Sequence, residues 1–278
     1  MSRNKLLKYP IKTITSALLY ILALLLLFPI YWMFVASFMP DADISSIPPL
    51  FFPKGLYLKN YIEMFRTAPT LRWFFNSVLV SSITTILIVL ISSMAGYSFA
   101  KKNFFARDII FYSMVLTMMI PKQILLVPLF KIVRDLNMFN TLAGLIVPAL
   151  GWPFGVFLIK QFMVTLPSEL VQSAKIDGCS ELGIYARIML PLAKPGLGAL
   201  AIFTFINSWN DYMWQLLVIS SKILKTLPLG VATFKEEFSA RYGIQLAGAS
   251  VASIPMIIIF LMFQKYFTKG ITLGAIKG

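Results

Sequence analysis

The chain has 278 residues, 58% of them hydrophobic and only 13% charged, and its 25 basic against 11 acidic residues give a net charge of +14. Soluble domains are about 45–50% apolar and about 25% charged, so this composition indicates an integral membrane protein. The lack of histidine and the single cysteine exclude an intramolecular disulfide, a Cys/His zinc cluster and histidine-based catalysis. The basic residues lie mostly between apolar blocks, which is typical of segments that meet membrane lipid rather than nucleic acid.

Six apolar blocks are long enough, or nearly so, to cross a bilayer, since a helix needs about 20 apolar residues for a roughly 30 Å core. The blocks cover residues 13–39, 73–100, 109–130, 141–162, 197–220 and 245–267. The first follows basic residues, but it is too long for a signal peptide and lacks a cleavage pattern, so we expect it to be retained. The sequence therefore predicts an all-α integral membrane fold with six transmembrane helices.

Six spans place both termini on one side of the membrane. Basic residues are dense in the amino-terminal tail, in the connection after the second block, after the fourth block and at the carboxyl end. Because cytoplasmic segments carry the excess of lysine and arginine, we expect both termini in the cytoplasm. The outer connections then cover residues 40–72 and 221–244.

The third block contains two prolines and a lysine. Pro121 and Pro128 free backbone groups in the helix, so they predict a kinked span beside a pore. Lys122 either faces that cavity or extends its side chain so that the ammonium reaches the outer surface. Both alternatives are open, and we favour the second.

A polar segment in two parts, residues 166–195, separates the fourth block from the fifth. Ser168 is placed to cap a first short helix, and Glu169 in its first turn suits the helix dipole. Gly178 is the expected stop of this helix, because glycine adopts a left-handed conformation without steric cost. The expected apolar face of the first helix consists of Leu170, Val171 and Ala174.

A second short helix is expected to begin after Ser180, which can cap it. Its expected apolar face consists of Leu182, Tyr185, Ile188 and Met189. Pro191 and Pro195 mark the return to the bilayer. Such a pair of helices is either a knob that docks into another protein or an amphipathic loop on the membrane surface without a partner.

The same segment resembles the cytoplasmic coupling loop, often called the EAA loop, of ABC importer permeases. The family pattern is loosely P-x-E-L-x-E-A-A-x-I-D-G-A-S, then an aromatic residue, then I-x-L-P-L-x-x-P. The sequence departs from this pattern at Gln172, Ser173 and Cys179, and Gln172 cannot form the salt bridge of the family's glutamate. The matching residues are Pro167, Glu169, Leu170, Ala174, Ile176, Asp177, Gly178, Ser180, Ile188, Leu190, Pro191, Leu192 and Pro195.

The resemblance covers nearly the whole chain. Residues 209–211 (Trp-Asn-Asp), 226–228 (Thr-Leu-Pro) and 274–278 (Gly-Ala-Ile-Lys-Gly) resemble the carbohydrate-uptake branch, and the chain as a whole resembles the maltose-type second permease subunit. The resemblance implies a type I ABC importer transmembrane domain. Residues 1–278 would form one domain, with a core permease region at 73–267 and the coupling loop at 166–195.

This resemblance implies a permease subunit that forms, with a second permease subunit, a pathway for a sugar or oligosaccharide delivered by an extracytoplasmic binding protein. The chain lacks the G-x-x-x-x-G-K-[ST] phosphate loop, so ATP and magnesium would bind to a separate ATPase dimer. The chain itself would be no enzyme and would hold no cofactor or metal. The implied location is the plasma (inner) membrane of a bacterium or archaeon. The alternative is an ion-coupled secondary transporter of small polar solutes, which gives no reason for the segment at 166–195.

The resemblance also implies that the coupling loop docks in a groove of the ATPase. The residues implied in this coupling are Glu169, Gln172, Ala174, Asp177, Gly178, Leu182, Tyr185, Ile188 and Pro191. A polar group in an apolar span is costly and usually faces a cavity or a partner helix. Asn207, Asn210, Asp211 and Lys122 are therefore candidates for the sugar pathway, with helix–helix hydrogen bonding as the other explanation.

Two further groups of residues carry weaker expectations. The aromatic residues Trp209, Tyr212 and Trp214 would either stack on sugars or belong to the aromatic belt of the membrane interface. The connection at 221–244 resembles the loop that meets the sugar-binding protein, and its charges are Lys225, Lys235, Glu236, Glu237 and Arg241. In some relatives the carboxyl tail reaches the ATPase, which would here involve Lys277 and Gly278.

Overall fold

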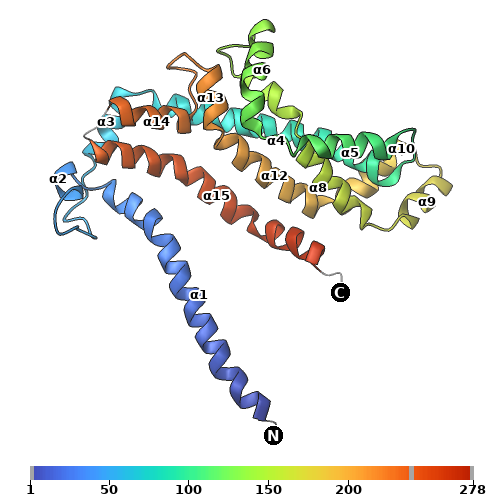
Figure 1. The fold of residues 1–278 in the computed structure, drawn as a ribbon, viewed down its shortest axis with the longest axis horizontal. Coiled ribbons are helices and arrows are strands. Elements are labelled where there is room, and N and C mark those ends of the chain that lie inside the picture. The colour runs from blue at the N-terminus through green and yellow to red at the C-terminus, as the bar shows by residue number, and fades with distance from the viewer. Residues whose placement is uncertain (1–2, 238–240, 276–278) are drawn as a thin grey trace. The chain divides into compact units, whose positions relative to one another are not determined.

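A computed structural model describes residues 3–237 and 241–275, and every regular element within them is a helix (Figure 1). The side chains of residues 3–13, 236 and 265–275 are not among those described. The expectations for Lys277, Gly278 and the side chain of Glu236 therefore lie outside the described residues, as do the side chains of the basic residues at both ends of the chain.

Most of the helices are separated by non-helical segments of different lengths. In chain order they are α1 (Arg3–Ala36), α2 (Asp41–Ile44), α3 (Lys59–Thr67), α4 (Thr70–Lys101), α5 (Arg107–Thr117), α6 (Lys122–Asp135), α7 (Ala143–Ile146), η1 (Val147–Leu150), α8 (Pro153–Val164), α9 (Glu169–Ile176), α10 (Glu181–Ile184), the π-helical η2 (Tyr185–Met189), α11 (Leu190–Leu192), α12 (Lys194–Trp209), α13 (Tyr212–Val218), α14 (Leu227–Glu237) and α15 (Tyr242–Ala275). The expected outer connections at 40–72 and 221–244 thus contain the short helices α2, α3 and α14.

The chain divides into two compact units. The first consists of Met1–Ala68 with Val231–Ser253, and the second consists of Pro69–Gly230 with Ile254–Gly278. Helices α14 and α15 each contribute residues to both units.

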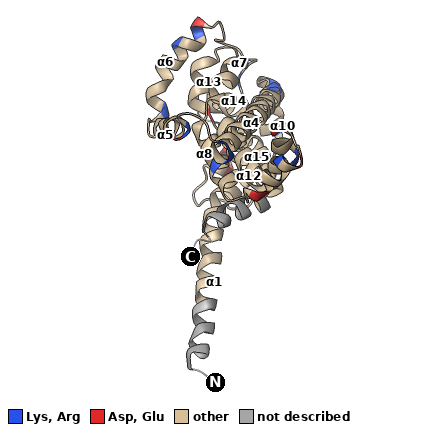
Figure 2. Ribbon diagram, turned by 90° about the vertical axis from the view of Figure 1, so that its right-hand side faces the viewer, with Lys and Arg blue, Asp and Glu red and all other residues tan. Residues whose placement is uncertain are grey.

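Candidate membrane spans are of two kinds. Three helices are long and apolar enough to cross a bilayer unbroken: Ile14–Ala36, Thr70–Lys101 and Tyr242–Gln264. Three bent pairs qualify only if each pair counts as one span: Arg107–Thr117 with Lys122–Asp135 (100°), Ala143–Leu150 with Pro153–Val164 (45°), and Glu181–Leu192 with Lys194–Trp209 (77°). Six spans are therefore reached only by counting bent pairs, and no charged residue lies in the span Ile14–Ala36 of α1 (Figure 2).

The expected third, fourth and fifth blocks are not continuous helices. Pro121 has extended backbone before α6, and Pro153 holds Trp152 at φ −95° and ψ 101°, outside the helical region. The fifth block breaks between α12 and α13 at Asn210 and Asp211, whose short polar side chains favour non-helical backbone. The kink predicted for the third block is therefore present as a break at Pro121, whereas the breaks in the fourth and fifth blocks were not predicted.

The core of the second unit lies where α4 packs against α8 and α12, which run side by side in Figure 1. Gly96 permits this approach, since a Cβ at that position would lie 2.8 Å from Cγ2 of Ile159. Small residues allow close packing of helices in membranes, where lipid offers no hydrophobic drive for association. The core includes Tyr97, Ile159, Met163, Ile184, Met189 and Leu200.

The Thr-Leu-Pro stretch at 226–228 is anchored to the beginning of α4. The Asn76 side-chain amide donates to the carbonyls of Ile223 (2.8 Å) and Lys225 (2.9 Å), and the backbone N–H of Leu227 donates to Oγ of Ser77 (2.7 Å). The Thr226 hydroxyl donates to Oε1 of Gln215. These buried polar groups hold the connection against the helix ends.

In the first unit, α3 ties the end of α1 to the beginning of α15. The buried Asn60 amide donates to the carbonyls of Ser37 (3.0 Å) and Met39 (2.8 Å). The guanidinium of Arg241 forms an ion pair with Glu63, with Nη2 and Oε2 2.6 Å apart. The sequence offered Arg241 as a contact for a partner protein, but the structure places it in this internal pair.

The pair between Glu63 and Arg241 predicts a pH dependence. Hydrogen bonds from Arg241 hold the pKa of the Glu63 carboxyl below its usual range, although burial opposes this. An ordinary glutamate titrates near about 4.3, so the contribution of the pair is present above that pH and is lost as the pH falls through the lowered folded-state pKa. We expect amide exchange in α3, corrected for its intrinsic pH dependence, to accelerate below about pH 4.

Hydrogen exchange with mass spectrometry on Glu63→Gln tests this expectation. That variant should exchange faster in α3 at neutral pH and lose the acid-dependent step. Asp43→Asn is the matched control, because it removes a carboxylate whose exposed pair with Lys54 spans 3.5 Å. An unchanged acid-dependent step in Glu63→Gln would contradict the assignment.

Candidate functional site

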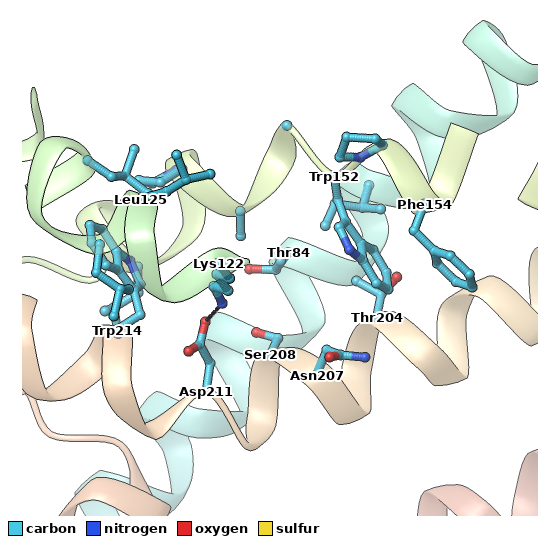
Figure 3. Close-up of a pocket in the computed structure, with 18 of the residues that line it drawn as sticks. Thr84, Lys122, Leu125, Trp152, Phe154, Thr204, Asn207, Ser208, Asp211 and Trp214 are labelled. Atoms are coloured by element: carbon cyan, nitrogen blue, oxygen red, sulfur yellow. Dashed lines mark hydrogen bonds and ion pairs between the residues drawn. The ribbon is translucent and has the colours of Figure 1, made fainter. Parts of the chain in front are cut away.

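A cavity of about 820 Å³ lies within the second unit, at the breaks in its helices (Figure 3). Its walls come from α4, from the α5–α6 break, from the η1–α8 break and from α12 and α13. The polar residues that line it are Thr84, Thr117, Lys122, Thr204, Asn207, Ser208, Asp211 and Gln215. Lys122 and Asp211 are its charged residues within the described part of the chain.

Lys122 and Asp211 form an ion pair inside this cavity, with Nζ and Oδ2 2.6 Å apart (Figure 3). Lys122 is the first residue of α6, and Asp211 lies between α12 and α13, so the pair joins two helix breaks. The ammonium of Lys122 thus has a carboxylate partner in the cavity, which agrees with the alternative that this residue faces the cavity. The Asp211 side chain is 21% exposed and that of Lys122 is 65% exposed.

Neutral polar groups and aromatic rings complete the cavity wall. The Thr84 hydroxyl is buried and has no hydrogen-bond partner among the described residues. Asn207 lines the cavity and donates to the carbonyl of Phe203 (2.8 Å). Trp152 and Phe154, with ring centroids 5.1 Å apart, lie beside these polar groups in Figure 3. Hydroxyl and amide groups next to aromatic faces suit a polyhydroxylated ligand.

The structure changes the expectations for the other residues of the fifth block. Asn210 does not line the cavity among the described residues; it ends α12. Trp209 is 1% exposed and stacks on Phe205 (5.7 Å between centroids), so it is a core residue and neither a sugar platform nor an interfacial side chain. Trp214 lines the cavity, and its indole N–H donates to the carbonyl of Gly144 (3.0 Å). Tyr212 is exposed.

The aromatic pair Trp152 and Phe154 was missed by the sequence analysis. The stretch Gly-Trp-Pro-Phe at 151–154 interrupts an apolar block, and a Gly-X-Pro sequence inside a span is a signal for a break. Thr84 carries no comparable signal, since serine and threonine recur along the whole of α4.

The segment at 166–195 consists of short helices, as predicted. Gly178 adopts the left-handed conformation, with φ +76°, directly after the first helix. Ser180 caps the second helix by accepting from the backbone N–H of Gly183 (3.2 Å). Ser168 makes no such cap within the described chain; its Oγ instead accepts from Nζ of Lys101 (3.1 Å).

The apolar residues of this segment divide between core and surface. Val171, Ala174, Tyr185 and Met189 are buried in the chain's own core. The expectation that Ala174 and Tyr185 face a partner is therefore corrected, because the two residues are only 5% and 7% exposed. Leu170 is exposed rather than packed, and Ile188 is half-buried. The remaining residues implied in coupling are all exposed: Glu169, Gln172, Asp177, Gly178, Leu182 and Pro191.

One large apolar side chain next to the turn was not among the expected coupling residues. Ile176 is 86% exposed, and Leu182 across the turn is 69% exposed. These two exposed apolar side chains, on either side of Gly178 in the sequence, are named the apolar tip of the segment.

Comparisons with known proteins place the chain among transport proteins. Residues 88–273 match the family described as "Binding-protein-dependent transport system inner membrane component". The chain is 40% identical to the arabinooligosaccharides transport system permease protein AraQ of Halalkalibacterium halodurans, over 92% of this chain and 93% of that protein. It is 32% identical to the sulfoquinovosyl glycerol transport system permease protein SmoH of Agrobacterium fabrum, over 97% and 94% of the two chains.

The fold is similar to that of a chain in the crystal structure of a bacterial ABC transporter involved in the import of the acidic polysaccharide alginate. The TM-score is 0.80 at 22% identity, over 96% of this chain and 99% of that chain.

Proposed function

Because the chain belongs to the binding-protein-dependent transport system inner membrane component family, we propose that it is the permease subunit of an ATP-driven ABC importer for a sugar or oligosaccharide. The family match is the observation that carries this function, together with relatives named as permeases of arabinooligosaccharides and of sulfoquinovosyl glycerol. The chain is a transport subunit and not an enzyme. It would form the membrane pathway with a second permease subunit and receive sugar from an extracytoplasmic binding protein.

An ATPase dimer would dock on the coupling loop at 166–195 and would hold ATP and its magnesium. The exposed tip formed by Ile176 and Leu182, with Gln172, Asp177 and Gly178 around it, supports this docking because it combines apolar area with a polar rim. Gln172 would contribute a neutral hydrogen bond where the family pattern has a glutamate.

The cavity is the proposed section of the sugar pathway within this subunit. Three of the candidate pathway residues line this cavity: Lys122, Asn207 and Asp211. Asn210 does not line it and instead lies at the end of α12. We place the chain in the plasma (inner) membrane of a bacterium or archaeon. Both termini would be cytoplasmic, because the coupling loop and the densest basic segments then share the cytoplasmic side. Residues 1–278 would act as one transmembrane domain with its core at 73–267.

Purification of the chain from its native membrane in mild detergent, followed by reconstitution, tests the function. The expected complex contains a second permease and an ATPase with a phosphate loop, and sugar uptake requires ATP and the binding protein. Uptake should persist when ionophores dissipate proton and sodium gradients. Recovery of the chain alone, with uptake that follows an ion gradient without ATP, would overturn the proposal in favour of a secondary transporter.

A further inference from the structure

Neither covalent connection of the coupling loop is a continuous straight helix. Helix α8 ends at Val164, and residues 165–168 are non-helical before α9 begins. At the other end, residues Glu181–Leu192 meet α12 at an angle of 77°. Such joints transmit a rigid-body movement of the loop poorly to the adjoining helices, because each joint can absorb the movement by changing a few backbone dihedrals. A direct contact with an unbroken span would carry the movement better.

The last turns of α4 provide such a contact. Ser93, Tyr97 and Lys101 follow one another at i, i+4 and i+8, so they share one face of an unbroken helix. The Ser93 Oγ and the Tyr185 hydroxyl share a buried hydrogen bond of 2.6 Å. The rings of Tyr97 and Tyr185 pack with centroids 5.5 Å apart. This face of α4 therefore holds the π-helical part of the loop.

Lysines at the end of α4 hold both halves of the loop. Lys101 Nζ donates to the carbonyl of Leu166 (2.6 Å) and to Oγ of Ser168 (3.1 Å), where the loop begins. Lys102, the residue after the helix, forms an ion pair with Glu181 at the start of α10.

Glu181 also binds a cation from the first half of the loop. Its Oε1 lies 3.1 Å from Nζ of Lys175 in α9. Because Lys175 and Glu181 lie on opposite sides of the Gly178 turn, the carboxylate joins both halves of the loop to the end of α4. The contact therefore bridges α9 and α10 and also joins them to the end of α4.

We propose that the cytoplasmic end of α4 is the element that carries movement of the coupling loop into the membrane, with Ser93, Lys101 and Lys102 as positioning residues. This inference rests on the proposed function. Exposed ion pairs contribute little to stability, and Glu181 is 57% exposed. The effect of the Lys102–Glu181 pair is therefore expected in coupling rather than in the amount of folded protein.

The test is the number of sugar molecules taken up per ATP hydrolysed by the complete reconstituted importer. Lys102→Glu and Glu181→Lys should each lower this ratio on the order of tenfold, within the range of a typical coupling interaction, at an unchanged amount of bound ATPase. Lys102→Arg should keep the ratio. The exchange Lys102→Glu with Glu181→Lys should recover part of the loss, since Lys175 still repels the new lysine.

Ser93→Ala provides a second test that leaves every charge in place. It removes the hydroxyl partner of Tyr185 and should lower the same ratio, and adding Tyr185→Phe should lower it no further, because both substitutions break one bond. Lys54→Glu is the control, since its exposed pair with Asp43 lies in the first unit.

Each contrary result has one meaning. A wild-type complex without ATP-driven uptake would refute the proposed function itself. An active wild-type complex with an unchanged ratio in Lys102→Glu and Ser93→Ala would overturn the role of α4. Loss of bound ATPase in Lys102→Glu, without recovery in the charge exchange, would also overturn it, because Lys102 would then act in docking.

Discussion

Replacement of Gly178 by leucine is expected to lower ATP-driven sugar uptake by on the order of tenfold or more while the chain stays inserted in the membrane. Gly178 has a φ of +76°, a region that costs an L-residue with a side chain about 1–2 kcal/mol. A Cβ there would meet no atom within 4 Å, so the expected effect comes from backbone strain and not from a clash.

The strain acts on the turn that orients the two halves of the coupling loop. The N–H of Gly178 donates to the carbonyl of Lys175 (3.1 Å), and that of Cys179 donates to the carbonyl of Ala174 (2.9 Å). A backbone that leaves the left-handed region loses this geometry and moves Ile176 relative to Leu182. The exposed apolar tip would then present a different shape to the proposed ATPase partner.

Two matched variants separate backbone strain from bulk. Gly178→Asn should retain more uptake than Gly178→Leu, because asparagine tolerates the left-handed region. Gly55→Leu should have no effect, since Gly55 also faces open space but lacks a positive φ. Uptake and ATP hydrolysis by the reconstituted importer are the measurements, and wild-type uptake by Gly178→Leu would refute the prediction.

Neutralising one partner of the Lys122–Asp211 ion pair in the cavity is expected to destabilise the protein. The loss of stability should differ between the two partners. Removing one partner of a buried pair costs about 3–5 kcal/mol because the other charge is left unpaired. Partial exposure to solvent lowers this figure to roughly 1–2 kcal/mol here. Asp211 is the less exposed partner, at 21% against 65% for Lys122, so Lys122→Gln should destabilise the complex more than Asp211→Asn.

Thermal unfolding of the purified complex and sugar uptake after reconstitution measure the two consequences. The double variant Lys122→Gln with Asp211→Asn should be more stable than Lys122→Gln alone, because it leaves no charge unpaired. Its uptake should stay low, since the pair that joins the α5–α6 and α12–α13 breaks is still absent. Equal stability of the two single variants would contradict the asymmetry, and normal uptake by the double variant would remove the pair from the pathway.

Local features of the coupling loop were predictable from the sequence. The helix stop at Gly178 and the helix cap at Ser180 depend only on residues within one or two turns. Neighbouring residues in the sequence are therefore sufficient to predict them. The cap expected at Ser168 failed for the opposite reason. Lys101, 67 residues away, contacts its hydroxyl and replaces the local interaction.

The cavity was predictable only in part. Asn207, Asp211 and Lys122 could be recognised as candidates because they are polar residues in apolar spans. Such groups are unfavourable in hydrocarbon unless they have a partner or water. Their spacing did not reveal that Lys122 and Asp211 pair across 89 residues. Trp209 and Asn210 belong to the same stretch but do not line the cavity, since Trp209 is buried against Phe205 and Asn210 ends α12.

The sequence alone is sufficient to predict that this protein is helical and membrane-embedded, because a bilayer satisfies no backbone hydrogen bonds and long apolar runs must satisfy their own. It also determined the helical pair of the coupling loop, through short-range capping and one glycine. The three-dimensional structure was needed to show that the fourth and fifth blocks are broken, that Tyr185 is buried against Ser93 while Leu182 is exposed, and that Lys102 meets Glu181. These outcomes depend on which helices pack together, and contacts between residues far apart in the chain are not encoded in any local pattern.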